Sequence, residues 1–241
     1  MIISFEGIEC AGKGVQIKKT AAYLRDLGLN LAIMREPGGT LYGEAIRKLL
    51  KNPKETIHAI NQEFADHADY TADTAPAKNQ DFSRTMACEL FLFLASRAEF
   101  MAKAVKPALV EGKIVLCDRL GDSSVAYQGG GHANGDPATV KFISDANRFA
   151  LQGANPDLTL FIDIPIETME ERLAKEHPDK LAFFERKYGK DFFERVRNMY
   201  GQIARQEPER IKVIDGTGTK EEVFERIKQQ LAALIGKNQG A

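Results

Sequence analysis

One glycine-rich loop constrains the fold of this chain more than any other feature of its sequence. The loop GIECAGK, residues 7–13, directly follows the apolar run Ile2 to Phe5 and leads into a helical pattern from Val15 to Leu27. Glycines let backbone N–H groups turn toward phosphate oxygens, the helix N-terminus adds positive potential, and the lysine reaches the β and γ phosphates of a nucleotide. The segment therefore predicts a phosphate-binding loop (P-loop) between the first strand and the first helix.

The loop departs from its usual form immediately after Lys13. Gly14 stands where a Ser or Thr hydroxyl normally binds magnesium, and Val15 offers no hydroxyl either. Mg²⁺ must then depend on water, phosphate oxygens and a carboxylate, and Asp118 is the predicted ligand because it follows the strand-like run Ile114 to Cys117. The residues predicted to contact ATP are Gly7, Glu9, Cys10, Ala11, Gly12, Lys13, Gly14 and Val15.

Strand-like and helical segments alternate along the chain. A parallel sheet covered by helices is the usual result of that alternation, so we expect a three-layer α/β P-loop fold with a five-stranded parallel sheet and helices on both faces. The chain is expected to form one domain, residues 1–241. The expected strands are Ile2 to Phe5, Leu31 to Met34, Ile114 to Cys117, Leu158 to Ile162 and Ile211 to Ile214; the expected helices are Val15 to Leu27, Gly43 to Leu50, Met86 to Val105 and Glu221 to Ile235.

Two segments interrupt this pattern. Residues 52–84 are polar and alanine-rich with little core material, which predicts an insertion that is partly helical or mobile. Residues 175–190 are charged and aromatic, which is typical of a lid over a nucleotide site.

Composition excludes several other classes of protein. With 34 acidic and 33 basic residues the formal net charge is -1, so no global field attracts nucleic acid or an acidic membrane, and Trp is absent. The cysteines Cys10, Cys88 and Cys117 are scattered, which argues against a disulfide framework or a zinc site. No signal peptide or long apolar run is present, so we expect a cytoplasmic protein that binds neither membrane nor nucleic acid.

Two arginines follow two of the expected strands. Arg35 comes after the second strand and Arg119 after the third, and the carboxyl ends of parallel strands meet at one edge of the sheet. A planar guanidinium pairs two oxygens of a phosphate at once, so this edge is suited to a phosphate monoester.

The chain resembles the thymidylate kinase family from Ile2 to Ile214, apart from the insertion. The resemblance rests on FEGIECAGKG, REPGGT, ELFLFLASRA, CDR followed by AYQGGG, and PDLTLFIDI, in that order. It implies a kinase that moves the γ-phosphoryl group of ATP to dTMP and gives dTDP for dTTP synthesis. It also implies Mg²⁺ as cofactor and a homodimer.

The resemblance further implies roles for individual residues. Phe93 resembles the aromatic residue that stacks on thymine, whereas its apolar neighbours alone would indicate core packing. Arg97 resembles the donor to a base oxygen. Arg35 and Arg119 resemble the clamps on the acceptor phosphate. The sugar side would be formed by Glu9 and Tyr127, with Ser124 and Gln128 contacting the sugar or the base. The implied catalytic residues are Lys13, Arg119 and the lid residue Arg186, for which Arg172, Lys180 and Lys187 are alternatives.

Two other functions stay open at this stage. Leu120 replaces the aromatic residue that is common after the Asp-Arg pair, so the acceptor could be another pyrimidine deoxynucleotide, such as dUMP or a modified one. The missing hydroxyl at Gly14 and the altered lid also fit a nucleotide-binding protein without turnover.

Overall fold

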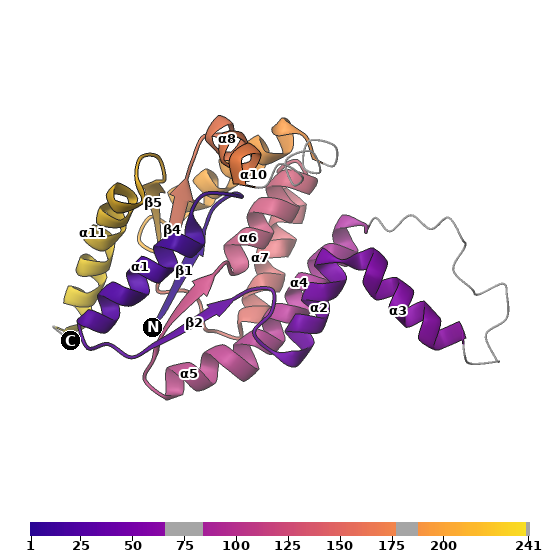
Figure 1. Ribbon diagram of the computed structural model, residues 1–241, viewed down its shortest axis with the longest axis horizontal. Helices are drawn as coiled ribbons and strands as arrows, with labels where there is room; N and C mark the ends of the chain where they lie inside the picture. The colour runs from indigo at the N-terminus through magenta and orange to yellow at the C-terminus, as the bar shows by residue number, and fades with distance from the viewer. Residues whose placement is uncertain (66–83, 177–187, 240–241) are drawn as a thin grey trace.

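A five-stranded, fully parallel sheet forms the centre of the computed structural model, which describes residues 1–65, 84–176 and 188–239 (Figure 1). The strand order is β2-β3-β1-β4-β5. The strands are β1 (Ile2–Glu6), β2 (Leu31–Arg35), β3 (Ile114–Asp118), β4 (Leu158–Asp163) and β5 (Ile211–Asp215).

Each strand extends one residue beyond its predicted apolar run and ends on a charged residue. Asp118, for example, pairs in register with both Phe5 and Arg35. Backbone pairing does not depend on the polarity of the side chain, so it continues past the point where the hydrophobic pattern stops. The carboxyl edge of the sheet therefore carries a row of charged side chains.

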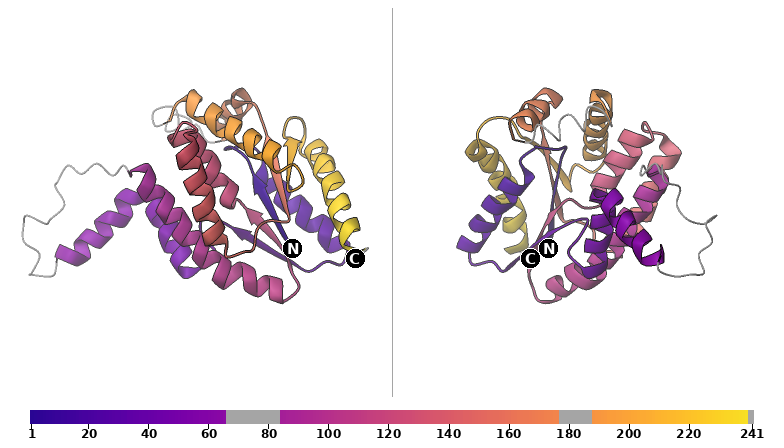
Figure 2. Two further views of the ribbon diagram at one scale, coloured as in Figure 1. Left: turned by 180° about the vertical axis from the view of Figure 1, so that it is seen from behind. Right: turned by 45° about the vertical axis from the view of Figure 1, so that its right-hand side comes forward.

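Helices cover both faces of the sheet, as predicted. The helices α1 and α11 pack side by side on one face, and α4, α7 and α10 lie on the other (Figures 1 and 2). The helical segments are α1 (Lys13–Asp26), α2 (Leu41–Lys51), α3 (Pro53–Ala65), α4 (Met86–Phe100), α5 (Lys106–Val110), α6 (Gly121–Ser124), α7 (Pro137–Leu151), α8 (Ile166–Glu176), α10 (Lys190–Gln206) and α11 (Lys220–Gln239), together with the wider π-helical segments η1 (Met101–Val105) and η2 (Val125–His132).

The prediction that a helix ends before Pro107 was wrong. From α4 the chain runs through η1 into α5, with Pro107 in the first turn of α5. A proline ring collides with the carbonyl four residues earlier in a regular α-helix. The wider turn of η1, in which the Lys106 N–H reaches back to the Met101 carbonyl, gives the chain room to continue in a helical path.

The predicted insertion begins as a helix. The helix α3 follows α2 directly and extends outward from the body of the protein (Figure 1), whereas residues 66–83 lie outside the described part of the chain. At the far end of the insertion, Arg84 donates to the carbonyls of Leu49 (3.2 Å) and Leu50 (2.8 Å). These contacts satisfy carbonyl groups in the last turn of α2.

The core is built from the buried strands and the apolar faces of the helices. Tyr200 of α10 stacks on Phe161 of β4, with the ring centroids 4.9 Å apart, and both side chains are buried. None of the helices in the described ranges combines the length and the apolar character that spanning a membrane requires.

Candidate active site

A cavity of about 750 Å³ opens at the carboxyl edge of the sheet, where the glycine loop meets α4, α6 and η2. Ligands of open α/β sheets bind at this edge. Most of the side chains predicted to form the site line this single cavity: Glu9, Cys10, Lys13, Arg35, Phe93, Arg97, Asp118, Arg119, Ser124, Tyr127 and Gln128.

The glycine loop has the backbone that a phosphate cradle requires. A Cβ at Gly7 would lie 2.5 Å from the Ile162 carbonyl oxygen, so only glycine lets β1 turn this close to β4. Gly12 adopts a left-handed conformation (φ 90°) at the start of α1, which glycine adopts without strain. The sequence therefore folds the loop directly onto a helix N-terminus.

Lys13 closes the loop on itself. Its ammonium group donates to the carbonyls of Gly7 (3.0 Å) and Ile8 (2.8 Å). Burial lowers the pKa of Lys13 to about 8, helped by the positive charge of Arg119, while the carboxylate of Glu9 acts in the opposite direction. A phosphate in the loop would supply the negative charge that this partly desolvated ammonium lacks.

Arg119 lines the cavity and has a strained backbone conformation. Its φ of 69° is unusual for a residue with a long side chain. The guanidinium donates to Ser123 (3.1 Å) and Tyr127 (3.2 Å) and lies 3.5 Å from a carboxylate oxygen of Glu9. The Tyr127 hydroxyl in turn donates to Glu9 (2.7 Å). These contacts fix the direction of the guanidinium before any ligand binds.

Glu6, which the sequence reasoning did not single out, holds this arrangement together. The side chain is completely buried and accepts hydrogen bonds from the Leu120 amide (2.7 Å), the Ser123 hydroxyl (2.6 Å) and the Tyr200 hydroxyl (2.8 Å). Burial raises the pKa of Glu6, and the negative charge of Asp122 adds to this effect. The sequence feature that could have indicated this role is the position of Glu6, a charged residue directly after the apolar run Ile2 to Phe5.

Arg97 is more enclosed than a residue expected to reach a base oxygen. It is 1% exposed, and its guanidinium pairs with the Glu36 carboxylate (2.9 Å) and donates to Ser124 (3.1 Å) and to Asn147. Burial raises the pKa of Glu36 to about 7, although the charge of Arg97 acts in the opposite direction. In this structure the Ser124 hydroxyl accepts a hydrogen bond from Arg97. The predicted contact of Arg97 with a base oxygen and that of Ser124 with the sugar or the base stay predictions.

The helix α4 presents one face to the cavity. Glu89, Phe93 and Arg97 follow one another at intervals of four residues and all line it. Glu89 accepts a hydrogen bond from the side-chain amide of Gln128 (2.9 Å) and lies 3.6 Å from the guanidinium of Arg84. Neither Glu89 nor Arg84 was predicted to belong to the site.

The remaining predicted residues differ in how they are placed. Arg35 lines the cavity with its side chain 56% exposed, and it pairs with Glu44 at 3.3 Å. Arg172 of α8 donates to the carbonyls of Cys10 (2.9 Å) and Gly216 (3.1 Å) and so contacts the glycine loop from outside. Arg186, with most of the predicted lid, lies outside the described residues.

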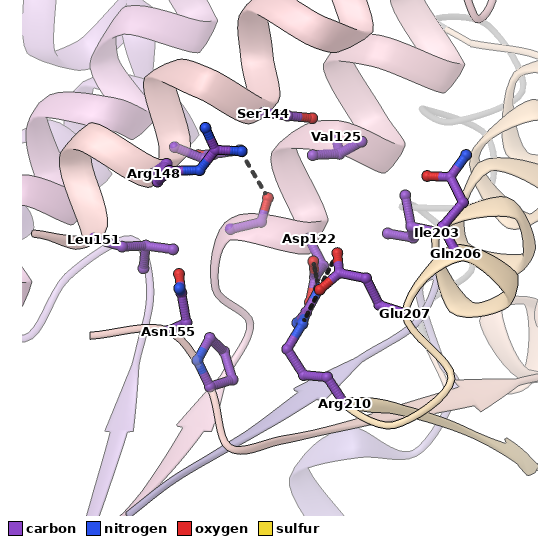
Figure 3. Close-up of a pocket in the computed structure, with 13 residues that line it drawn as sticks. Asp122, Val125, Ser144, Arg148, Leu151, Asn155, Ile203, Gln206, Glu207 and Arg210 are labelled. Atoms are coloured by element: carbon purple, nitrogen blue, oxygen red, sulfur yellow. Dashed lines mark hydrogen bonds and ion pairs between the residues drawn. The ribbon is translucent and has the colours of Figure 1, made fainter. Parts of the chain in front are cut away.

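A second cavity of about 220 Å³ lies between α7, α6 and the end of α10 (Figure 3). Its most buried cation, Arg210, is already paired with Asp122 (2.7 Å) and Glu207 (2.7 Å). None of the predicted site residues lines it, so the larger cavity is the candidate active site.

The first strand runs through a glycine loop into a helix, and basic side chains face that loop across one cavity. This arrangement defines a P-loop nucleotide-binding protein. Comparison with known proteins narrows the class, because the sequence profile of the family described as Thymidylate kinase matches residues 5–74 and 73–227. The chain belongs to the thymidylate kinase family.

Individual relatives match along nearly the whole chain. A thymidylate kinase of Fervidobacterium nodosum is 40% identical over 235 residues, which are 98% of this chain and 100% of that protein. One of Pseudomonas putida is 36% identical over 240 residues and covers 100% of both chains. A crystal structure of thymidylate kinase from Ehrlichia chaffeensis superposes with a TM-score of 0.65 at 30% identity, covering 96% of this chain and 98% of that one.

Proposed function

We propose that this protein is an ATP-dependent kinase that phosphorylates dTMP to dTDP. The observation that carries the proposal is that one cavity joins Lys13 of the phosphate loop to Arg119 and to the aromatic residue Phe93. Donor phosphates and a pyrimidine acceptor can therefore occupy a common space, which the membership of the family also supports. We further propose that the chain acts as a single thymidylate-kinase-like domain.

The acceptor phosphate is already a nucleophile at neutral pH, so the reaction needs no activating base. Catalysis consists of positioning the two phosphates and neutralising the charge that spreads over the transferred group. Lys13 binds the β and γ phosphates of ATP, and Arg119 holds the acceptor phosphate with Arg35. Glu9 and Tyr127 lie beside Arg119 and close the sugar side. Arg186 of the lid is proposed to complete the set of cations.

Mg²⁺ fits this site with few protein ligands. Among the described residues, no three carboxylate, histidine or cysteine groups gather where they could hold a metal ion together. Asp118 at the end of β3 lines the cavity with Lys13, and one hard carboxylate oxygen suits a cation that keeps several waters and binds phosphates. Bound there with ATP, magnesium would neutralise phosphate charge, and Asp118 would orient one of its waters.

A homodimer is proposed from an apolar surface on α4 and α7. Phe91, Phe142 and Phe149 are 57%, 51% and 85% exposed, and the rings of Phe91 and Phe142 are in contact with centroids 6.5 Å apart. Exposed aromatic clusters of this kind mark interaction surfaces. Light scattering of Phe142→Glu tests this proposal, with Val110→Glu on α5 as control; a wild-type monomer would contradict it.

The decisive test of the activity is ATP-dependent ADP release with Mg²⁺ and each of dTMP, dUMP, dCMP, UMP, CMP, AMP and GMP. Turnover that is fastest with dTMP and absent in Lys13→Ala is expected. Faster turnover with dUMP would mean another pyrimidine acceptor, and nucleotide binding without turnover would mean a non-catalytic binding protein. Because nucleoside monophosphates and ATP are cytoplasmic metabolites, we propose that the protein acts in the cytoplasm.

A further inference from the structure

The side-chain amide of Gln128 is held in one orientation by a carboxylate. Its Nε2 donates to Glu89 Oε1 at 2.9 Å, and Gln128 is 2% exposed, so the side chain has little freedom to move elsewhere. An ionised carboxylate only accepts hydrogen bonds, which means that the nitrogen and not the oxygen of the amide faces Glu89. The choice between the two amide orientations, usually ambiguous, is settled here by chemistry.

Glu89 is itself kept in place by its surroundings. The guanidinium of Arg84 lies 3.6 Å from Glu89 Oε2, and Arg84 is anchored on the carbonyls of Leu49 and Leu50 at the end of α2. His132 Nε2 lies 3.7 Å from Glu89 Oε1. The orientation of Gln128 therefore depends on a chain of contacts that begins at α2.

With its nitrogen bound to Glu89, Gln128 offers the cavity its carbonyl oxygen. Gln128 lines the cavity together with Phe93, and no hydrogen bond to its Oε1 occurs within the described parts of the chain. Thymine and uracil carry an N–H at ring position N3, whereas cytosine carries a bare nitrogen that only accepts. A fixed acceptor oxygen pairs with the first two bases and repels the third.

We propose that Glu89 is a positioning residue that selects the base of the acceptor by fixing the amide of Gln128 as a hydrogen-bond acceptor. The proposal rests on the proposed function, since it names what makes the same pocket accept a thymine-type base and refuse cytosine. It assigns to Glu89 no contact with the nucleotide.

The test is the ratio of kcat/KM for dTMP to that for dCMP. In Glu89→Gln the neutral side chain can donate as well as accept, so the Gln128 amide is free to turn its NH₂ group toward cytosine. Loss of a charge-assisted hydrogen bond should lower the dTMP:dCMP ratio by about 10-fold or more. The dTMP:dUMP ratio should not change, because both bases carry the same N–H. Glu209→Gln, an exposed carboxylate in the turn before β5, is the matched control.

A double-mutant cycle shows whether Glu89 acts through Gln128. Gln128→Met alone should also lower the dTMP:dCMP ratio, and adding Glu89→Gln to it should change the ratio no further. The proposal is wrong if Glu89→Gln lowers both activities and the thermal stability together at a constant ratio. It is equally wrong if the ratio in the Gln128→Met background still responds to Glu89→Gln, or if Gln128→Met keeps the full ratio. Inactive wild-type protein would instead overturn the proposed function.

Discussion

The close packing of η2 against α10 makes Gly130→Ala the most informative single substitution. A Cβ at Gly130 would lie 2.5 Å from Met199 Cβ and 3.0 Å from the Arg195 carbonyl oxygen. Nonbonded carbon atoms prefer a separation of roughly 3.5–4.0 Å, so the two segments must move apart by about 1 Å. Since both contacts involve the backbone or its first side-chain atom, no rotamer change relieves them.

The expected loss follows from these distances. Overpacking of this kind costs about 1–3 kcal/mol, and a contact with backbone atoms places Gly130→Ala near the upper end. Alanine also stabilises a helix by about 0.5–1 kcal/mol relative to glycine, which offsets part of this loss. The net loss of about 2 kcal/mol should lower Tm by roughly 4–8 °C in a chain of this size. Because η2 also carries Tyr127 and Gln128, kcat/KM for dTMP should fall with it.

Thermal unfolding followed by circular dichroism measures the effect, and Gly201→Ala in α10 is the control. A Cβ at Gly201 would meet only the tip of Arg205, at 3.4 Å, so this variant should be more stable than wild type by about 0.5–1 kcal/mol. If Gly130→Ala and Gly201→Ala both raise Tm, the close approach of η2 and α10 is refuted.

Three further predictions concern the site. Because burial lowers the pKa of Lys13 to about 8 and bound phosphates raise it, ATP binds with uptake of a proton at higher pH, and its Kd should rise as pH increases above about 8. Gly14→Ser supplies a hydroxyl where a Cβ meets no atom within 4 Å, so the Mg²⁺ concentration for half-maximal activity should fall roughly fivefold. Arg97→Ala leaves the Glu36 carboxylate buried without its cation, so urea unfolding should show a loss of about 3–5 kcal/mol, partly recovered by adding Glu36→Gln.

Each of these has a result that would contradict it. The claim that deprotonation of Lys13 weakens ATP binding would be contradicted by a Kd for ATP that is constant from pH 7 to 9.5. It would also be contradicted if Lys13→Arg showed the same pH dependence as wild type. An unchanged magnesium requirement in Gly14→Ser would mean that the hydroxyl cannot reach the metal. Arg97→Ala as stable as wild type would mean that Glu36 becomes protonated without cost.

The sheet was predictable from sequence because its strands are short apolar runs separated by helical patterns. The glycine loop was also predictable, since its spacing follows from the geometry of phosphate binding. The continuation of the helix through Pro107 could not be predicted, because the π-helical turn in η1 that accommodates the proline depends on local backbone geometry that no residue pattern indicates. Tertiary packing there overrides the usual effect of proline on a helix.

The site was predicted less completely than the fold. Residues that line the cavity, such as Lys13 and Arg119, follow from motifs and strand ends. Glu6 and Glu89 were missed because their hydrogen-bond donors, Tyr200 and Gln128, lie far away in the sequence. The sequence around a carboxylate does not indicate which donor it will pair with in the folded chain. Sequence patterns locate a charged side chain at an edge of the sheet, but only the folded chain shows which neighbours hold it.

The hydrogen bond from Tyr200 to Glu6 joins positions separated by 194 residues. The first strand and the loop leave the ribosome early. Tyr200, whose hydroxyl helps to hold the buried Glu6 carboxylate next to Arg119, is synthesised only near the end of translation. Long-range contacts of this kind form late because the intervening chain must first be ordered. Recovery of phosphoryl transfer during refolding should therefore lag behind the recovery of helical circular dichroism, which makes enzyme activity a reporter of the last step in assembly.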